Sequence, residues 1–388
     1  TNTHIFIAAG EVSGDLLGAD LMAALKTKRA EIVFSGIGGD SMMAQDKNFT
    51  SLFDMADLSV FGIFPVLAQL PNIIKRMVQT INHICDTKPD VIVLIDNPDF
   101  MHFLAKRIRR RLPATPIICY VAPQIWAWRR GRAHKMKDFC DAILALLPFE
   151  PQVYQANDGP PCHFVGHSVA TRYQQMDIAT DFRTRHNIAA RAPLLCVLPG
   201  SRAAEVKRLT PIFGRVIKDL ATRIPDLEIC MPLVPHVAAQ IKQHTNDWAL
   251  QPHFTNTDKD KWAAFRASDA ALAASGTVTL ELTMTQTPMV VAYDMGNLTN
   301  FFALRIMQTP SVVLTNLILD KPLIKEFLGY AANVAAITPE IYKLLTDTTH
   351  NKAMRTALAP VQDMLLPATS TPAQAAADIV LKLRSSVY

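Results

Sequence analysis

Short, continuous apolar runs alternate with amphipathic stretches along the first half of the chain. The apolar runs at residues 5–9, 32–34, 91–95, 117–121 and 142–146 predict buried strands, and residues 16–26, 72–85 and 100–111 have helical periodicity. Strands that are apolar on both faces and alternate with helices are typical of a parallel sheet covered on both sides. The first half therefore predicts one doubly wound α/β domain.

The same pattern starts again after a polar stretch at about residues 170–192. Strands are expected at residues 194–198, 227–231, 270–273 and 289–292, with a long helix at residues 205–223. We predict two Rossmann-like doubly wound parallel-sheet domains facing a cleft, an N-terminal one at residues 1–168 and a C-terminal one at residues 169–337. An Ala-rich helical tail at residues 338–388 is expected to pack back on them.

Composition narrows the class of protein. The chain has 388 residues, of which 49% are hydrophobic, so low-hydrophobicity disorder is excluded. Six cysteines without a CxxC pair indicate reduced thiols in a cytoplasmic protein. The longest apolar stretches are interrupted by Pro65 or too short for a bilayer, which needs about 20 residues. Membrane contact is therefore expected to be peripheral.

The formal net charge of +5 conceals a strongly basic region. Residues 101–137 hold ten Lys or Arg and no acid, which leaves 29 basic against 34 acidic residues elsewhere.

Close to this basic region in the sequence, residues 58–81 are unusually apolar and suit either a core or a shallow membrane contact that admits acyl chains. Indoles among arginines are typical of an anchor on anionic headgroups. Single-stranded nucleic acid is an alternative partner, but no RNA-binding motif is present, so we expect no nucleic acid. The membrane or lipid candidates are Phe61, Ile63, Phe64, Trp126, Trp128, Arg129, Arg130 and Arg132.

Candidate chemistry in the first half follows two predicted strands. The glycine-rich turn at residues 10–15 contains Glu11 and Asp15, which suit helix caps or the binding of hydroxyl groups. Asp96 follows the strand at residues 91–95, where a carboxylate is placed to act as a general base. The alternative role is capping the next helix, for which Asp99 is the better candidate.

Two turns in the second half suit a nucleotide diphosphate. Gly200, Ser201 and Arg202 precede the long helix, so amides and a guanidinium can meet phosphate oxygens; the alternative is a capping serine beside a solvated arginine. Ser275, Gly276 and Thr277 follow another strand, and Glu281 lies one helical turn later, suited to a ribose diol. His163 and His167 lie at a strand end and not on a helix, so we assign no metal.

Seven motifs in order resemble the lipid-A-disaccharide synthase family. They are AGEVSGD at 9–15, IDNPDF at 95–100, YVAPQIWAWR at 120–129, LLPFE at 146–150, FVGH at 164–167, LPGSRAAEV at 198–206, and ASGT at 274–277 with Glu281. The resemblance implies a GT-B glycosyltransferase that joins UDP-2,3-diacylglucosamine to 2,3-diacylglucosamine 1-phosphate with inversion and releases UDP. It implies a peripheral enzyme on the cytoplasmic face of the inner membrane, which needs no metal or other cofactor.

The resemblance also assigns roles to positions of this chain. Asp96 matches the proposed general base, and the acceptor side comprises Glu11, Ser13, Asp15 and Asp99. The UDP side comprises Gly200, Ser201, Arg202, Ser275, Gly276, Thr277, Glu281 and Asn316. Three positions depart from the expected pattern: Thr315 replaces a proline, Asp320 stands where a glycine is usual, and Asp294 stands where a basic residue is common.

Two other function classes fit parts of the pattern. A UDP-sugar 2-epimerase would share the architecture and the donor site but has no use for an acyl-accepting face. A sugar-nucleotide or lipid-binding protein would not need Asp96. A homodimer is compatible with the sequence.

Overall fold

A computed structural model of the chain describes residues 3–58, 63–128, 130–294, 296, 309–368 and 370–385. The chain divides into two compact units, Thr1–Ser168 with Leu365–Tyr388, and Val169–Met364. Each unit holds one six-stranded sheet in which every pairing is parallel. The predicted fold class of two doubly wound parallel-sheet domains is therefore confirmed.

The first unit contains a sheet with the strand order β2-β1-β3-β4-β5-β6. Its strands are β1 (Thr3–Ala9), β2 (Ile32–Ile37), β3 (Val91–Ile95), β4 (Ile117–Tyr120), β5 (Ala142–Ala145) and β6 (Cys162–Phe164). Side chains on β3 alternate between two separate cores, with Ile92 and Leu94 in one and Val91, Val93 and Ile95 in the other. Both faces of this sheet are therefore buried, which explains the continuous apolar runs.

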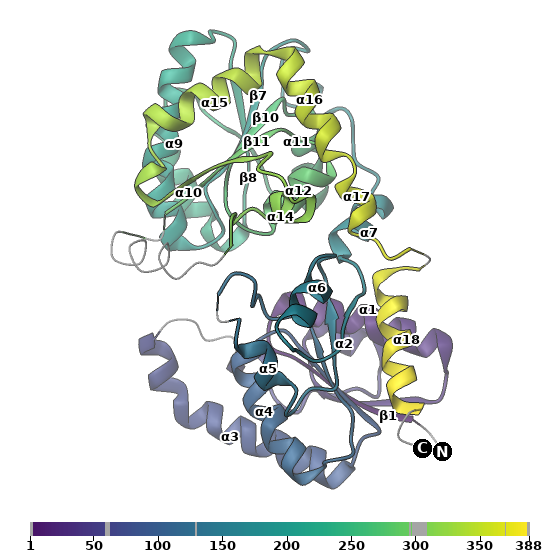
Figure 1. The fold of residues 1–388 in the computed structure, drawn as a ribbon. Helices are drawn as coiled ribbons and strands as arrows, with labels where there is room; N and C mark the ends of the chain where they lie inside the picture. The colour runs from purple at the N-terminus through teal and green to yellow at the C-terminus, as the bar shows by residue number, and fades with distance from the viewer. Residues whose placement is uncertain are drawn as a thin grey trace. The chain divides into compact units, whose positions relative to one another are not determined.

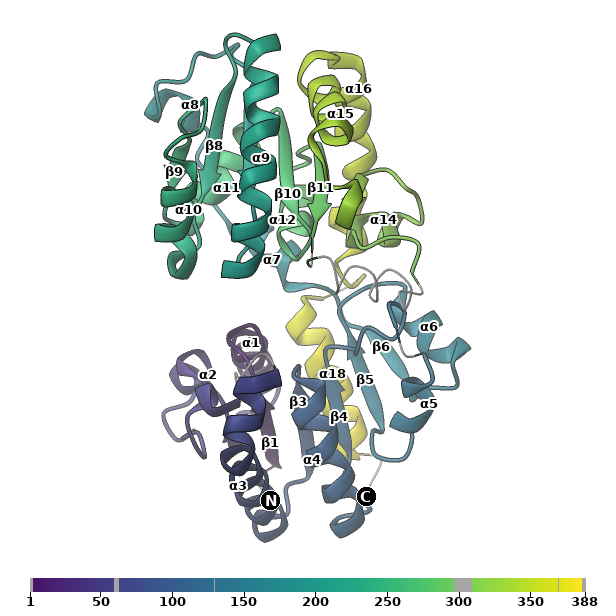
Figure 2. The same ribbon diagram turned by 90° about the vertical axis from the view of Figure 1, so that its left-hand side faces the viewer.

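Helices cover the two faces of the first sheet. One face is covered by α3 (Ile63–Thr87), α4 (Pro98–Arg111), α5 (Arg132–Met136) and α6 (Glu150–Ala156), and Figure 2 shows α4 in front of β3 and β4. The other face is covered by α1 (Val12–Lys28) and α18 (Pro372–Ser385), which pack together (Figure 1). The short α2 (Asp40–Gln45) lies against α1, and η1 (Met55–Leu58) precedes α3.

The second unit repeats this plan with the order β12-β11-β10-β7-β8-β9. Its strands are β7 (Leu194–Leu198), β8 (Glu228–Pro232), β9 (His253–Thr255), β10 (Ala270–Ala274), β11 (Met289–Tyr293) and β12 (Lys325–Leu328). The strands at the centre are fully buried along their length, whereas β12 has no fully buried residue. The core of this unit therefore lies around β7, β10 and β11.

Helices also cover both faces of the second sheet. Figure 1 shows α9 (Ala203–Arg223) and α15 (Val334–Thr346) on one side, with α11 (Asp258–Ala267) and α12 (Val278–Met284) on the other. The remaining helices are α7 (Ser168–Gln175), α8 (Phe182–Arg185), η2 (Pro235–Val237), α10 (Ala238–Thr245), α14 (Leu314–Leu319), η3 (Gly329–Ala331), α16 (Thr348–Leu358) and α17 (Val361–Met364).

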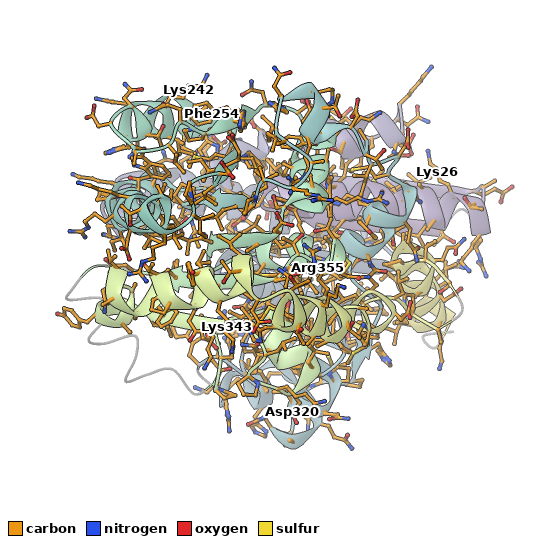
Figure 3. All side chains as sticks on the ribbon, turned by 90° about the horizontal axis from the view of Figure 1, so that it is seen from above. Lys26, Lys242, Phe254, Asp320, Lys343 and Arg355 are labelled. Carbon is orange, nitrogen blue, oxygen red and sulfur yellow. The ribbon has the colours of Figure 1, made fainter. Side chains whose placement is uncertain are left out.

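The C-terminal helices divide between the units instead of forming one tail. Helices α15, α16 and α17 belong to the second unit, while α18 returns to the first. Arg355 on α16, labelled in Figure 3, donates hydrogen bonds to the carbonyls of Ser268 at 2.7 Å and Gln286 at 3.3 Å. These bonds attach α16 to the loops that precede β10 and β11. Among the described residues, no helix is long and apolar enough to cross a bilayer.

Candidate functional site

The strand order of each sheet reverses direction at one point. In the first sheet the chain moves outward from β1 to β2 and returns to β3 on the other side, and in the second it moves from β7 to β9 and returns to β10. Ligands of open α/β sheets bind beyond the carboxyl ends of the strands at this switch point. The strands that flank the switch points are β1 and β3 in the first sheet and β7 and β10 in the second. The turns after these four strands contain Glu11, Asp96, Arg202 and Ser275 respectively, so all four predicted turns lie at a switch point.

Asp96 comes directly after β3 and is half-buried. Its Oδ1 accepts a hydrogen bond from the amide of Asn97 at 2.9 Å, and its Oδ2 accepts a long one from the Ser13 hydroxyl at 3.5 Å. The first bond fixes the orientation of the carboxylate, while the second leaves Oδ2 only weakly held. A carboxylate oxygen in this position can accept a proton from a hydroxyl group.

The backbone around Asp96 is strained. Asp96, Asn97 and Val121 all have left-handed backbone angles, with φ of 56°, 40° and 73°. The left-handed region is uncommon outside glycine and particularly unfavourable for a β-branched residue such as Val121. Gly10 makes room for this loop, because a Cβ there would lie 2.6 Å from the Cβ of Asn97. Such clusters of strained residues are typical of functional sites, where the surrounding structure maintains them.

A pocket of about 230 Å³ opens beside this strained loop. It contains the predicted base Asp96, the exposed indole of Trp128 and the guanidinium of Arg132. The other lining residues are Pro98, Val121, Ala122, Pro123, Gln124 and Ile125. The pocket thus brings together a carboxylate, an aromatic side chain and a cation, a set that suits a ligand with hydroxyl and anionic groups.

The other predicted acceptor-side residues have different surroundings. Asp15 is buried, and its carboxylate accepts hydrogen bonds from the amides of Gly39, Ser41 and Met42 at 2.7, 2.9 and 3.2 Å. It therefore caps the start of α2, and these contacts give it a structural role. Glu11 is half-buried at the N-cap of α1, but its side chain makes no capping hydrogen bond there.

The prediction that Asp99 caps the next helix is wrong. Helix α4 begins at Pro98, two residues before the expected start at residue 100, and its N-cap is Asn97, whose Oδ1 accepts a hydrogen bond from the amide of Phe100 at 3.4 Å. Asp99 instead lies in the first turn, and its largely exposed carboxylate accepts a hydrogen bond from Arg132 at 3.4 Å.

The predicted membrane residues separate into different environments. Trp126 is only 8% exposed and donates a hydrogen bond from Nε1 to Glu150 at 3.3 Å, so it belongs to the core and cannot face a membrane. Arg132 lines the pocket instead of lying on an open surface. Arg130 is exposed, Phe61 and Arg129 lie outside the described residues, and of Ile63 and Phe64 only the backbone, in α3, is described.

In the second unit, the turn after β7 is closed by a residue of its own helix. Oε2 of Glu205 accepts hydrogen bonds from the amides of Ser201 at 3.1 Å and Arg202 at 3.3 Å, and its Oε1 lies 3.3 Å from Nη1 of Arg202. Gly200, with φ of 112°, allows this close approach. The N-cap is Arg202, so the alternative of a capping serine is wrong. The amides expected to meet phosphate are therefore occupied, while the side chain of Arg202 is 73% exposed.

The helix that follows the turn after β10 carries Glu281, whose carboxylate lies close to two cations. Ser275 donates a hydrogen bond to the carbonyl of Val312 at 3.2 Å, and Gly276 and Thr277 are exposed. The carboxylate of Glu281 is buried, with Nζ of Lys261 at 3.0 Å and Nη2 of Arg172 at 4.0 Å. A carboxylate held in this way can accept hydrogen bonds from a diol.

Asn316 is buried and holds the chain that follows it. Its Oδ1 accepts from the amide of Ile324 at 2.8 Å, and its Nδ2 donates to the carbonyl of Ile324 at 2.9 Å. Two of the departures from the family pattern have local explanations. The hydroxyl of Thr315 pairs with that of Thr283 at 2.7 Å, and Asp320 adopts the left-handed C-cap conformation, with φ of 50°, that a glycine usually provides.

Sequence reasoning missed three residues that support the site: His102, Glu205 and Lys261. Glu205 stands inside a motif that we identified, three residues after Arg202, which is the spacing of a capping glutamate. His102 and the contact of Lys261 with Glu281 have no comparable sequence signal, because Arg132 and Glu281 come from other elements; the sequence spacing indicates only the pair of Lys261 with Asp258 on the same helix. Within the described ranges, no group of three His, Cys, Asp or Glu side chains is placed to hold a metal ion.

Comparisons with known proteins agree on one family. A family model described as lipid-A-disaccharide synthetase matches residues 5–380. The lipid-A-disaccharide synthase of Rhodopseudomonas palustris (strain HaA2) is 39% identical over 381 residues, which cover 98% of this chain and 96% of that protein. The protein of the same name from Rhodospirillum centenum (strain ATCC 51521 / SW) is 40% identical over 380 residues, covering 98% and 94% of the two chains.

Solved structures with little sequence similarity share the fold. The S. aureus MnaA-UDP co-structure aligns with a TM-score of 0.65 at 12% identity and covers 100% of this chain and 98% of that one. The glycotransferase of kitacinnamycin aligns with a TM-score of 0.63 at 15% identity and covers 99% of both chains. At such low identity, these likenesses support the two-sheet architecture alone.

Proposed function

This chain belongs to the lipid-A-disaccharide synthase family, and we propose that Asp96 of the first unit is the general base of its reaction. The enzyme is a glycosyltransferase of lipid A synthesis that joins UDP-2,3-diacylglucosamine to 2,3-diacylglucosamine 1-phosphate and releases UDP. The observation that carries the role of Asp96 is its place in the pocket, at a switch point, on a strained loop.

The proposed step is a direct displacement with inversion. The carboxylate of Asp96 takes the proton of the acceptor 6-hydroxyl as its oxygen attacks the anomeric carbon of the donor. The bond from this carbon to the diphosphate oxygen breaks at the same time, and its electron pair leaves with UDP. The proton then passes from Asp96 to solvent, which restores the base.

Asp96→Asn tests the assignment, because the amide cannot accept the proton but occupies nearly the same volume. We expect the rate of disaccharide formation to fall at least about 1,000-fold, within the contribution of general bases, while UDP binding is unchanged. Substrates and products are followed by mass spectrometry. For the wild-type protein, formation of disaccharide plus UDP supports the transferase, and formation of an epimerised UDP-sugar supports an epimerase. The absence of both products supports a binding protein. An Asp96→Asn variant with substantial activity would rule out the base.

The donor diphosphate is proposed to meet Arg202 in the second unit. Its guanidinium is exposed and stands at the N-terminus of a helix of 21 residues, where the helix dipole also favours an anion. Glu281 is proposed to accept hydrogen bonds from the ribose. In this proposal the charge of the departing diphosphate is stabilised by side chains of the chain itself, so chelation of divalent metals by EDTA should leave the rate unchanged.

Calorimetry with UDP tests the role of Arg202. Arg202→Ala should weaken binding about tenfold or more, the loss expected for a charge-assisted hydrogen bond. Arg223→Ala is the matched control, because Arg223 is also partly exposed and lies at the other end of the same helix, paired with Asp219. Equal affinities of the two variants for UDP would place the diphosphate elsewhere.

We propose further that the first unit binds an anionic membrane surface peripherally, on the cytoplasmic face of the inner membrane. Leu70, Ile74 and Val78 are exposed at intervals of four along α3, and Phe103 is exposed on α4, which packs on α3. Exposed apolar side chains beside the basic residues of α4 suit an interface of acyl chains and phosphate headgroups. Binding to anionic liposomes should weaken as salt is raised, and equal binding to neutral liposomes would contradict the electrostatic part.

A further inference from the structure

The pocket that contains Asp96 also contains a cation that general-base chemistry does not require. Its volume of about 230 Å³ is smaller than that of most ligand pockets, which run from about 300 to 1,000 Å³, and so it suits a single sugar ring. Arg132 forms part of its wall together with Asp96 and Trp128. A base alone gives no reason for a guanidinium at this place.

We propose that Arg132 binds the 1-phosphate of the acceptor sugar in this pocket, and that His102 is the residue that positions Arg132. The inference rests on the proposed function, because it takes the phosphorylated sugar as the acceptor and Asp96 as its base. It replaces the membrane role that the sequence pattern suggests for Arg132.

The hydrogen bonds of Arg132 leave most of its guanidinium available to a ligand. Nη2 donates to Nδ1 of His102 at 3.3 Å, and lies 3.4 Å from both the carbonyl of Pro98 and Oδ1 of Asp99. No described residue accepts a hydrogen bond from Nε or Nη1 of Arg132. A guanidinium presents its donors as a planar fork that matches two oxygens of a phosphate.

His102 is a suitable partner because it orients the cation without neutralising it. An arginine only donates hydrogen bonds, so Nδ1 of His102 must carry its lone pair. Burial of the imidazole, together with the nearby charges of Arg132 and Lys106, lowers the pKa of His102 to about 3, so the ring is neutral at physiological pH. The ring is fixed in place by Phe139, whose centroid lies 5.1 Å away.

The carboxylate of Asp99, which lies beside Arg132, cannot take over the role of His102 in orienting the guanidinium. Asp99 is 89% exposed on its side chain and 3.4 Å from Nη2, and exposed ion pairs of this kind contribute little because water screens them. The guanidinium therefore keeps most of its positive charge for a ligand. A buried carboxylate at the position of His102 would instead cancel that charge.

The chemistry of the acceptor explains why both groups share one pocket. In a pyranose, C1 and C5 both adjoin the ring oxygen, so the phosphate on C1 and the hydroxymethyl group on C5 project from the same edge of the ring. If Arg132 holds the phosphate, the 6-hydroxyl is directed along that edge toward the base. Holding a substrate at a second point in this way aligns the reacting atoms and contributes to the rate.

The test compares two acceptors, 2,3-diacylglucosamine 1-phosphate and the methyl glycoside of the same diacylated sugar. Arg132→Gln should lower kcat/KM for the phosphorylated acceptor about 30- to 100-fold, in line with a lost charge-assisted pair. Its kcat/KM for the methyl glycoside should stay within about twofold of the wild type. Arg132→Lys keeps the charge but not the planar fork, so its kcat/KM for the phosphorylated acceptor should lie between those of the wild type and Arg132→Gln. Arg29→Gln is the control, because Arg29 is exposed in the same unit and does not line the pocket.

A second pair of variants tests His102. His102→Leu should raise KM for the phosphorylated acceptor about tenfold with little change in kcat, and should leave the methyl glycoside unaffected. His102→Asn places an amide oxygen near the position of Nδ1 and should restore most of the loss. A purely structural role would affect both acceptors alike and would not be rescued by asparagine.

Equilibrium binding of each acceptor in the absence of donor separates this inference from the proposed function. Weaker binding of the phosphorylated acceptor alone to Arg132→Gln supports the subsite even if the wild type forms no disaccharide, a result that would overturn the proposed function. Equal losses for both acceptors, or no loss for either, would overturn the phosphate subsite even if Asp96→Asn is inactive.

Discussion

Removing the amino group of Lys261 should weaken UDP binding, although this side chain need not touch the nucleotide. Nζ of Lys261 lies 3.0 Å from Oε1 of Glu281, and the two side chains are 24% and 11% exposed. Lys261→Met keeps the length of the aliphatic chain and removes the charge. The carboxylate proposed to accept hydrogen bonds from the ribose then loses the partner that fixes its position.

The size of the effect follows from the geometry of the pair. Two unit charges 3.0 Å apart attract by about 5 kcal/mol at an effective dielectric constant of about 20, and desolvation offsets much of this. Arg172, whose Nη2 lies 4.0 Å from the same oxygen, can compensate in part. We therefore expect Lys261→Met to lower the free energy of unfolding by about 2 kcal/mol and to weaken UDP binding about tenfold, which corresponds to about 1.4 kcal/mol.

Urea denaturation and calorimetry with UDP measure the two effects. Lys259→Met is the matched control on the same helix, because Lys259 is 60% exposed and 3.9 Å from Asp177, and we expect it to change either quantity by less than about 0.5 kcal/mol. If Lys261→Met loses stability but binds UDP like the wild type, Glu281 does not need Lys261 to hold the ribose. If both variants behave alike, the pair contributes nothing.

Three further outcomes are expected from the first unit. Asp15→Ala should lower the free energy of unfolding by about 2–3 kcal/mol in urea denaturation, because three amides at the start of α2 lose their acceptor; an unchanged midpoint would contradict the capping role. Val121→Gly should relieve a left-handed β-branched residue and raise the unfolding free energy by about 1 kcal/mol, while lowering the rate of disaccharide formation as the pocket wall loosens; a less stable variant would contradict this. Burial raises the pKa of Glu150 from 4.5 to about 7, so the native state binds this proton more tightly than the unfolded state does. The contribution of Glu150 to stability therefore falls as the pH rises from about 4.5 to 7, by at most about 3 kcal/mol. Unfolding at pH 5 and pH 8 should therefore differ less in Glu150→Gln than in the wild type, and equal differences would refute the shift.

The fold was predictable where strands are buried on both sides. The strands β3 and β7 match the expected apolar runs residue for residue. Strands β9 and β12, which we did not predict, and β6, of which we predicted only a strand end between His163 and His167, each lie at the edge of a sheet and are only partly buried. An edge strand pairs on one side only and need not be buried on both faces, so its apolar pattern is often weaker. The edge strand β2 was still predicted in part, from the apolar run at residues 32–34.

For α3, the sequence pattern predicted the helix but not where it begins. We expected a helix at residues 72–85, which would begin just after Pro71; a proline inside a helix removes one backbone hydrogen bond. The helix instead begins at Ile63 and contains Pro71. Its apolar face and its packing on α4 outweigh the loss of that bond.

Residue types at strand ends were predictable, but their partners were not. A carboxylate after a central strand identified Asp96 from the sequence, because the topology of a parallel sheet fixes where that residue lies. The pattern of indoles among arginines could not separate Trp126, which is buried, from Trp128, which is 45% exposed. The two residues lie in an irregular turn, where no periodicity indicates which side chain faces inward.

The partners of the three cations differ in a way that suits their proposed ligands. In the second unit, Arg202 pairs with Glu205, and Lys261 pairs with both Glu281 and Asp258. A diphosphate that binds Arg202 therefore competes with Glu205, which limits the affinity for UDP and so favours release of this product. In the first unit, the buried partner of Arg132 is a neutral imidazole, so a phosphate binds there without displacing a buried anion. Under these proposals the acceptor phosphate meets a guanidinium whose buried partner is neutral and whose only carboxylate neighbour in the described chain, Asp99, is exposed, whereas UDP meets a guanidinium paired with a buried carboxylate. We therefore expect the acceptor to be held more firmly than the departing UDP.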